Sequence, residues 1–116
     1  MPTLIRAADR PDGPRRTMKF EGAAHGTGLS FFSVDIDPGR GVGLHFHPYD
    51  EIWLVLSGNV TFRTEEGEYP AKINDIMIVE AETPHGFTAT GTTPLRMMCL
   101  HNSPQIIQTF LDPSES

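Results

Sequence analysis

The chain of 116 residues contains little cysteine, few basic side chains and no long apolar run. Its single cysteine, Cys99, cannot form an internal disulfide, so other interactions must hold the fold together. Lysine and arginine number 9 against 15 acidic residues, and the formal net charge is -6. This balance argues against nucleic acid as a partner, because no basic surface is available for a phosphate backbone.

Membrane and export signals are also missing. No segment approaches the roughly 20 apolar residues of a membrane-spanning helix. Residues 1–16 lack the apolar core of a signal peptide. We therefore expect a cytoplasmic protein that has no membrane partner and forms one domain over residues 1–116.

Short apolar stretches separated by turn residues run through the chain, with 11 glycines and 10 prolines spread along it. This texture is typical of an all-β sandwich or barrel. The turn signal Ser57-Gly58-Asn59 predicts that residues 51–56 and 60–64 form a hairpin. A second turn, near residues 91–94, predicts another hairpin between 86–90 and 95–101. The other expected strands are 30–37 and 75–79.

The C-terminal segment departs from the strand pattern. Ser103 and Pro104 suit the N-cap and first position of a helix. Apolar residues then recur at helical spacing until Asp112-Pro113 ends the turn. The sequence therefore predicts a short helix over about residues 104–111.

The stretch GVGLHFHPYDE, residues 41–51, places His45 and His47 two positions apart. On one strand both imidazoles would point to the same face. A turn at Pro48 would let Glu51 start the next strand beside them. Two imidazoles and a carboxylate at one point suit a divalent transition metal. The open alternative is that both histidines are ordinary half-buried strand residues.

The wider spacing resembles the first motif of the cupin family, G(X)5HXH(X)3E(X)6G. All five positions are matched, by Gly39, His45, His47, Glu51 and Gly58. The second motif, G(X)5PXG(X)2H(X)3N, is matched at its histidine by His85. The chain departs from that motif at Asn74, Glu80, Glu82 and Ala89.

The resemblance implies a small antiparallel β-barrel, with its core at about residues 28–101, and a metal held by His45, His47, Glu51 and His85. The alternative for His85 is a loop histidine without a ligand role. Iron, manganese, nickel and zinc all suit such ligands. Three imidazoles and one carboxylate leave open coordination positions, which favours chemistry over scaffolding.

Two function classes follow from the resemblance. The first is an enzyme acting on a small organic molecule as a dioxygenase, isomerase, lyase, decarboxylase or cyclase. The second is a binding module for a sugar or effector, without turnover. The fold alone does not decide between them.

Strand parity also predicts the pocket wall and the outer surface. Inward-facing histidines imply that Trp53 and Val55 face inward too, and we expect the pocket wall to include these residues together with Phe87, Met97 and Cys99. An apolar set would then share one outer surface: Leu44, Phe46, Ile52, Leu54 and Leu56. Such a patch needs cover. The candidates are a strand at residues 3–6, the C-terminal helix and a second subunit, and we expect a homodimer.

His101 is the candidate catalytic residue outside the motifs. If residues 86–90 and 95–101 pair around a turn at Thr92 or Thr93, His101 faces the same side as His85. It would then line the pocket as an acid or base without binding the metal. The alternative is that it caps the strand end or hydrogen-bonds the following turn.

Three further residues are left without a firm role. His25 lies outside both motifs and is expected at the surface. Glu80 and Glu82 are expected to be solvated charges in a loop, with a role as acid or base in the pocket as the alternative.

Overall fold

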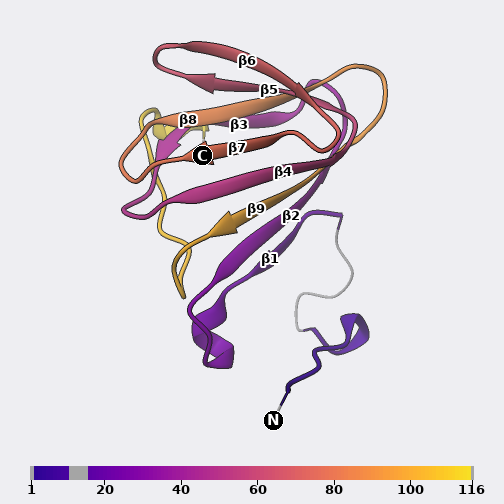
Figure 1. Cartoon of the computed structure of the whole chain (residues 1–116), viewed down its shortest axis with the longest axis vertical. Helices are drawn as coiled ribbons and strands as arrows, with labels where there is room; N and C mark the ends of the chain where they lie inside the picture. Colours follow the sequence, from indigo (N-terminus) through magenta and orange to yellow (C-terminus); the bar gives the residue numbers. More distant parts are fainter. Residues whose placement is uncertain (1, 11–15, 116) are drawn as a thin grey trace.

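The computed structural model describes residues 2–10 and 16–115, and its strands form two antiparallel sheets of five strands each (Figure 1). The first sheet has the order β1-β2-β9-β4-β7, with the bounds Met18–Phe20, Ser30–Ile36, Leu95–His101, Glu51–Ser57 and Ile76–Val79. The second has the order β10-β3-β8-β5-β6, with the bounds Thr109–Phe110, Gly41–Phe46, His85–Thr90, Asn59–Thr64 and Gly67–Lys72. The remaining elements in these two ranges are three short 3-10 helices: η1 (Ala7–Asp9), η2 (Gly22–His25) and η3 (Pro113–Glu115).

The all-β prediction is confirmed, but the closed barrel is not. Within the described ranges no strand ladder joins one sheet to the other. The sheets instead bury their inner faces between them, as in a jelly roll. The core is made by alternate residues of these strands: Val34, Trp53, Val55, Val60, Phe62, Phe87, Ala89, Leu95, Met97 and Cys99.

Both predicted hairpins are wrong. β4 pairs with β7 and β9, whereas β5 pairs with β6 and β8. β8 likewise pairs with β3 and β5, whereas β9 pairs with β2 and β4. At both turns the chain therefore crosses from one sheet to the other. The first crossing passes Gly58, whose added Cβ would meet the Pro94 carbonyl oxygen at 2.4 Å, so the two crossings pack against each other.

The predicted helix over residues 104–111 is also wrong. This segment runs extended and adds β10 to the edge of β3, with Phe110 opposite His45. Its backbone groups are taken by distant partners: the Ile107 carbonyl accepts from His47, and the Leu111 N–H donates to the Leu44 carbonyl at 3.0 Å. Tertiary hydrogen bonds have replaced those that a helix would form within itself.

The outer-surface prediction needs two corrections. Residues 3–6 form no strand, and Leu4 is 72% exposed, so they cover nothing. The five apolar residues also do not share a surface, since Leu44 and Phe46 belong to β3 in the second sheet. The remaining three lie on the outer face of β4 in the first sheet, where they join residues of β7 and β9: Ile76, Ile78, Met98 and Leu100.

Two residues that replace motif glycines adopt the backbone conformation that favours glycine. Asn74 has φ 70° and Glu82 has φ 66°, and no other described non-glycine residue has a positive φ. Asparagine tolerates this left-handed region, whereas glutamate is strained in it. The Glu82 N–H nevertheless donates to the His47 carbonyl at 2.7 Å, which ties this loop to the histidine pair.

We predict that Glu82→Gly stabilises the protein by about 0.5 to 1 kcal/mol, because relief of left-handed strain exceeds the added chain entropy of glycine. Urea unfolding would measure the change. Asn74→Gly is the matched control and should change stability by less. A less stable Glu82→Gly variant would contradict the strain argument.

Candidate metal centre

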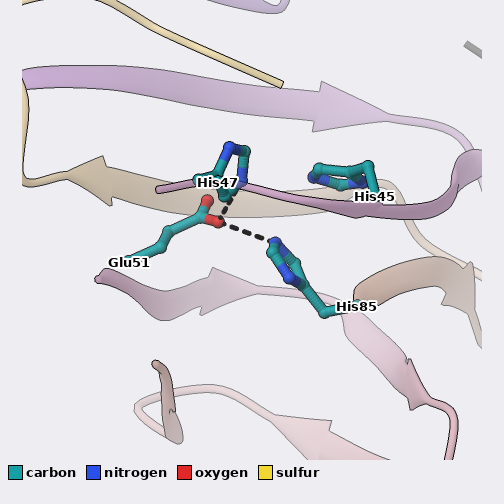
Figure 2. Close-up of side chains that lie close together, drawn as sticks. All are labelled: His45, His47, Glu51 and His85. Atoms are coloured by element: carbon teal, nitrogen blue, oxygen red, sulfur yellow. Dashed lines mark hydrogen bonds and ion pairs between the residues drawn. The ribbon is translucent and has the colours of Figure 1, made fainter. Parts of the chain in front are cut away.

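Three neighbouring segments bring the four predicted ligands together between the sheets. His45 lies near the end of β3 and His47 directly follows that strand, while Glu51 begins β4 and His85 begins β8. All four are at most 3% exposed, and one ligand atom from each lies within 4.8 Å of the others (Figure 2). Such a group could hold a metal ion.

An irregularity in β3 sets the direction of the His45 side chain. The ladder between β3 and β8 shifts register between Val42 and His45, and it then places His45 directly opposite His85. Bulges of this kind re-aim side chains. The two imidazole rings consequently lie 4.4 Å apart between centroids.

Backbone carbonyls fix the tautomers of the three histidines. Nδ1 of His45 lies 2.9 Å from the Gly43 oxygen, Nδ1 of His47 lies 2.7 Å from that of Ile107, and Nδ1 of His85 lies 2.7 Å from that of Thr83. A carbonyl oxygen only accepts, so each Nδ1 must carry the proton. In its neutral form each ring then presents an Nε2 lone pair, the form in which histidine binds metals.

The Glu51 carboxylate lies close to two of these Nε2 atoms. Oε1 of Glu51 lies 3.0 Å from Nε2 of His47 and 2.9 Å from Nε2 of His85. The contact with His85 has hydrogen-bond geometry, whereas the contact with His47 does not, and Nε2 of His47 is a buried atom without a hydrogen-bond partner. Lone pairs facing an anionic oxygen repel unless a positive charge lies among them. The residues therefore fit a cation.

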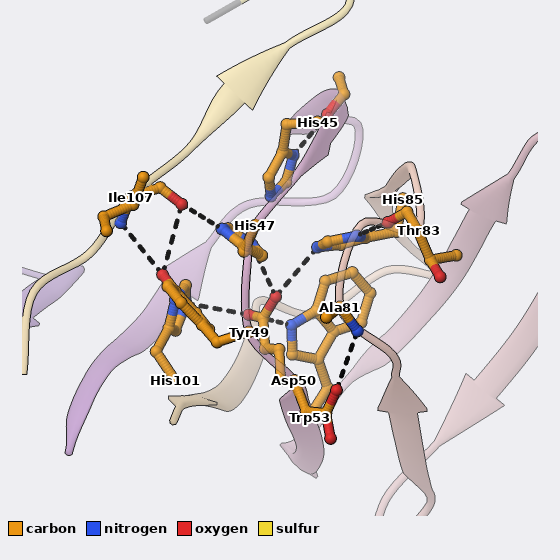
Figure 3. A network of polar contacts seen from close by, with 12 residues as sticks. His45, His47, Tyr49, Asp50, Trp53, Ala81, Thr83, His85, His101 and Ile107 are labelled. Atoms are coloured by element: carbon orange, nitrogen blue, oxygen red, sulfur yellow. Dashed lines mark hydrogen bonds and ion pairs between the residues drawn. The ribbon is translucent and has the colours of Figure 1, made fainter. Parts of the chain in front are cut away.

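His101 also reaches this carboxylate, but it is held differently. Its Nε2 lies 3.0 Å from Oε2 of Glu51, and its Nδ1 lies 2.6 Å from the Tyr49 hydroxyl (Figure 3). A hydroxyl can donate, so this ring can accept at Nδ1 and keep a proton on Nε2 for the carboxylate. Trp53 Nε1 donates to the same oxygen. Oε2 is thus occupied by donors while Oε1 faces the ligand nitrogens.

Burial and these contacts set the protonation states. Burial alone would raise the pKa of Glu51, but the side chains of His101, His47 and His85 that contact its carboxylate outweigh burial and hold the pKa far below its usual range. Burial is the main reason that the pKa of His45 falls to about 4, and it outweighs the hydrogen bond to Gly43, which raises the pKa. At neutral pH Glu51 is ionised and His45 is neutral, as metal binding requires.

A cavity of about 370 Å³ lies beside the centre. Three of the expected pocket residues, Trp53, Phe87 and Cys99, line it, as do His45, Glu51 and His101. Val55 and Met97 face inward but lie in the fully buried core, away from its lining.

The residues without a firm role lie outside the ligand group. His25 is exposed and stacks on Phe20 with 5.1 Å between ring centroids. Glu82 is exposed in the loop before β8. Glu80 is exposed and lines a second cavity, of about 320 Å³, which Trp53 and His85 also line.

Sequence reasoning missed Tyr49 and Ile107. The Tyr49 hydroxyl accepts the Ile107 N–H at 3.1 Å, in addition to its contact with His101. Tyr49 adjoins the histidine motif, so its position was a usable signal. No local sequence pattern identifies Ile107, because its carbonyl reaches His47, 60 residues away in the sequence, only in the folded protein.

Residues 32–101 match the family model of the cupin domain, and this segment includes all four candidate ligands. The chain belongs to the cupin family. The curated oxalate-binding protein of Thermotoga maritima is 29% identical to this cupin over 79 residues, which make up 67% of this chain and 65% of that protein.

Solved structures show the same fold at lower identity. An uncharacterised protein with a double-stranded β-helix domain from Klebsiella pneumoniae has a TM-score of 0.73 at 18% identity, over 96% of this chain and 99% of its own. Oxalate decarboxylase of Bacillus subtilis, studied for its Mn(II) centres, has a TM-score of 0.71 at 17% identity, over 82% of this chain and 27% of its own. This cupin thus corresponds to about a quarter of the decarboxylase.

None of the helical segments in residues 2–10 and 16–115 is both long and apolar enough to cross a bilayer.

We predict that the protein takes up one divalent ion per chain, and that His47→Ala and Glu51→Gln each reduce metal content severely, because each removes a ligand. Metal analysis after dialysis against manganese or zinc would measure this. His25→Ala and Glu68→Gln are matched controls at exposed positions. Equal metal content in ligand and control variants would contradict the site.

Proposed function

We propose that this cupin is a metal-dependent enzyme that binds a small organic acid at the centre formed by His45, His47, Glu51 and His85. The carrying observation is the convergence of Nε2 of His47 and Nε2 of His85 on Oε1 of Glu51 at 3.0 and 2.9 Å, while Nδ1 of each ring is already held by a backbone carbonyl. The proposed cofactor is a divalent transition ion among iron, manganese, nickel and zinc. The Mn(II) centres of the decarboxylase relative make manganese the first to test.

The cavity supports a reaction at this centre. Four protein ligands leave about two positions of a six-coordinate ion for other groups. Glu51 and His45 both line the cavity, so a molecule within it reaches the ligand group directly. A bound ion would act there as a Lewis acid that polarises a carboxylate or carbonyl oxygen.

His101 is the proposed catalytic residue. It lines the same cavity, is 1% exposed and lies beside the ligands with its own hydrogen-bond partner, Tyr49. Its role is to exchange a proton with the bound molecule or to hold that molecule by a hydrogen bond.

A binding function without turnover is the second candidate. One observation favours it: the relative from Thermotoga maritima is an oxalate-binding protein and not a named enzyme. The same ligand group would then hold an organic acid for storage or sensing.

We predict that the metal-loaded protein binds oxalate and the metal-free protein does not, which calorimetry would measure. His101→Ala should keep its metal while losing about a hundredfold in turnover of any substrate found. His25→Ala is the control. A His101→Ala variant that keeps both metal and activity would remove His101 from the mechanism. An absence of metal-dependent binding of every carboxylate tested, oxalate included, would contradict the proposed function.

The outer face of the first sheet supports a homodimer. Ile78, Ile52 and Leu100 form one row across β7, β4 and β9, and Ile76, Leu54 and Met98 form the next. Ile76 and Ile78 are 63% and 68% exposed. A face with two adjacent apolar rows can pack on its own copy about a two-fold axis.

We predict a dimeric mass by light scattering at micromolar concentration, and Ile52→Glu should shift it to the monomer because a charge would enter the interface. Ile73→Glu is the control, since Ile73 is 55% exposed but lies outside every strand. A monomeric mass for the unaltered protein would count against the dimer.

A further inference from the structure

The 370 Å³ cavity has three parts of different chemistry. His45, Glu51 and His101 form its buried polar end. Three exposed residues, Thr17, Arg40 and Gln108, lie at its opening. Between them the wall is apolar and is made mainly by Phe32, Val34, Ile36, Val42, Phe87 and Phe110.

The apolar wall has little to offer a polar ligand. Strands β2, β3 and β8 contribute most of it, and they are paired in their sheets, so much of their backbone hydrogen bonding is used in the ladders. Val34 and Phe87 are 5% and 4% exposed. A polar group placed against this wall would lose its hydrogen bonds to water without replacement. An apolar group would gain by burial.

The size of the cavity also favours a ligand with a sizeable apolar part. Cavities of about 300 to 1,000 Å³ hold ligands of drug-like size. A two-carbon dianion such as oxalate would occupy the polar end and leave most of the apolar wall in contact with water. The cavity is therefore poorly matched to the ligand named for the Thermotoga maritima relative.

We infer that the ligand of this site is a monocarboxylic acid with an extended apolar body, whose carboxylate lies at the His45 and Glu51 end and whose body lies along the Phe32 and Val34 wall. This inference rests on the proposed function, since the ion would hold the carboxylate. Arg40 at the opening adds a positive charge on the path of an entering anion.

A series of straight-chain carboxylates tests this with the manganese-loaded protein. Calorimetric titration from acetate to octanoate should give a Kd that falls about fourfold per methylene and then levels off as the cavity fills. Octanoate should bind more tightly than oxalate. A Kd that stays constant along the series, or oxalate binding more tightly than octanoate, would overturn the inference.

Variants of Val34 test whether the apolar chain binds in the cavity or on the exposed apolar face of the first sheet. Val34 faces inward opposite Met97, midway along the wall. Val34→Phe narrows the cavity, so the gain in affinity per methylene should end at a shorter carboxylate chain. Val34→Ala widens the cavity, so the gain should continue to a longer chain. If Val34→Phe does not fold, Val34→Ala still carries the test. An unchanged chain-length profile in the folded variants would contradict binding in this cavity.

The outcomes also distinguish the two proposals. Metal-dependent oxalate binding with a flat chain-length series leaves the proposed function standing and removes the inference. Failure to take up any divalent ion removes the proposed function, and the inference falls with it because no ion would then hold the carboxylate.

Discussion

The buried carboxylate of Glu51 is the constraint on which the rest of the structure depends. A carboxylate that is 3% exposed is costly unless several groups compensate it. Here four side chains contact it: Trp53 on the same strand and His101 on β9 approach Oε2, while His85 on β8 and His47 after β3 approach Oε1, where a cation would complete the compensation. Two of these belong to each sheet or its extension. Side chains from both sheets thus converge on this one charge, close to the turn that joins β3 to β4.

The irregular parts of the chain orient the rings around that charge. The three carbonyls that accept from the ligand histidines belong to Gly43 at the bulge, Thr83 in the loop before β8, and Ile107 ahead of β10. A regular strand could not provide them, because its carbonyls are used in the ladder. This explains why the segment before β10 is extended: a helix would have kept the Ile107 carbonyl for itself.

The sequence predicted correctly which face of a strand is buried, but not which strands pair with one another. Alternation along residues 51–56 placed Glu51, Trp53 and Val55 on the buried face, and motif spacing identified the four residues that the structure groups. Period-two patterns do not say which strand lies alongside, so both hairpins were misassigned. His101 is buried because it pairs with Glu51 across β4 and β9, and not because β8 lies beside β9. The helix prediction was wrong for a different reason: residues 104–111 form hydrogen bonds with residues far away in the sequence in place of bonds within a helix.

The position of Trp53 divides the interior into two approaches to the centre. Its side chain lines both the 370 Å³ cavity and the 320 Å³ cavity, while its Nε1 holds Oε2 of Glu51. The second cavity is lined by Glu66 and Glu80 against a single arginine, Arg63. The first cavity has Arg40 at its opening. The carboxylate that lines it belongs to Glu51, which His101 already contacts. An organic anion therefore meets the more favourable potential on the Arg40 side, where the apolar wall also lies.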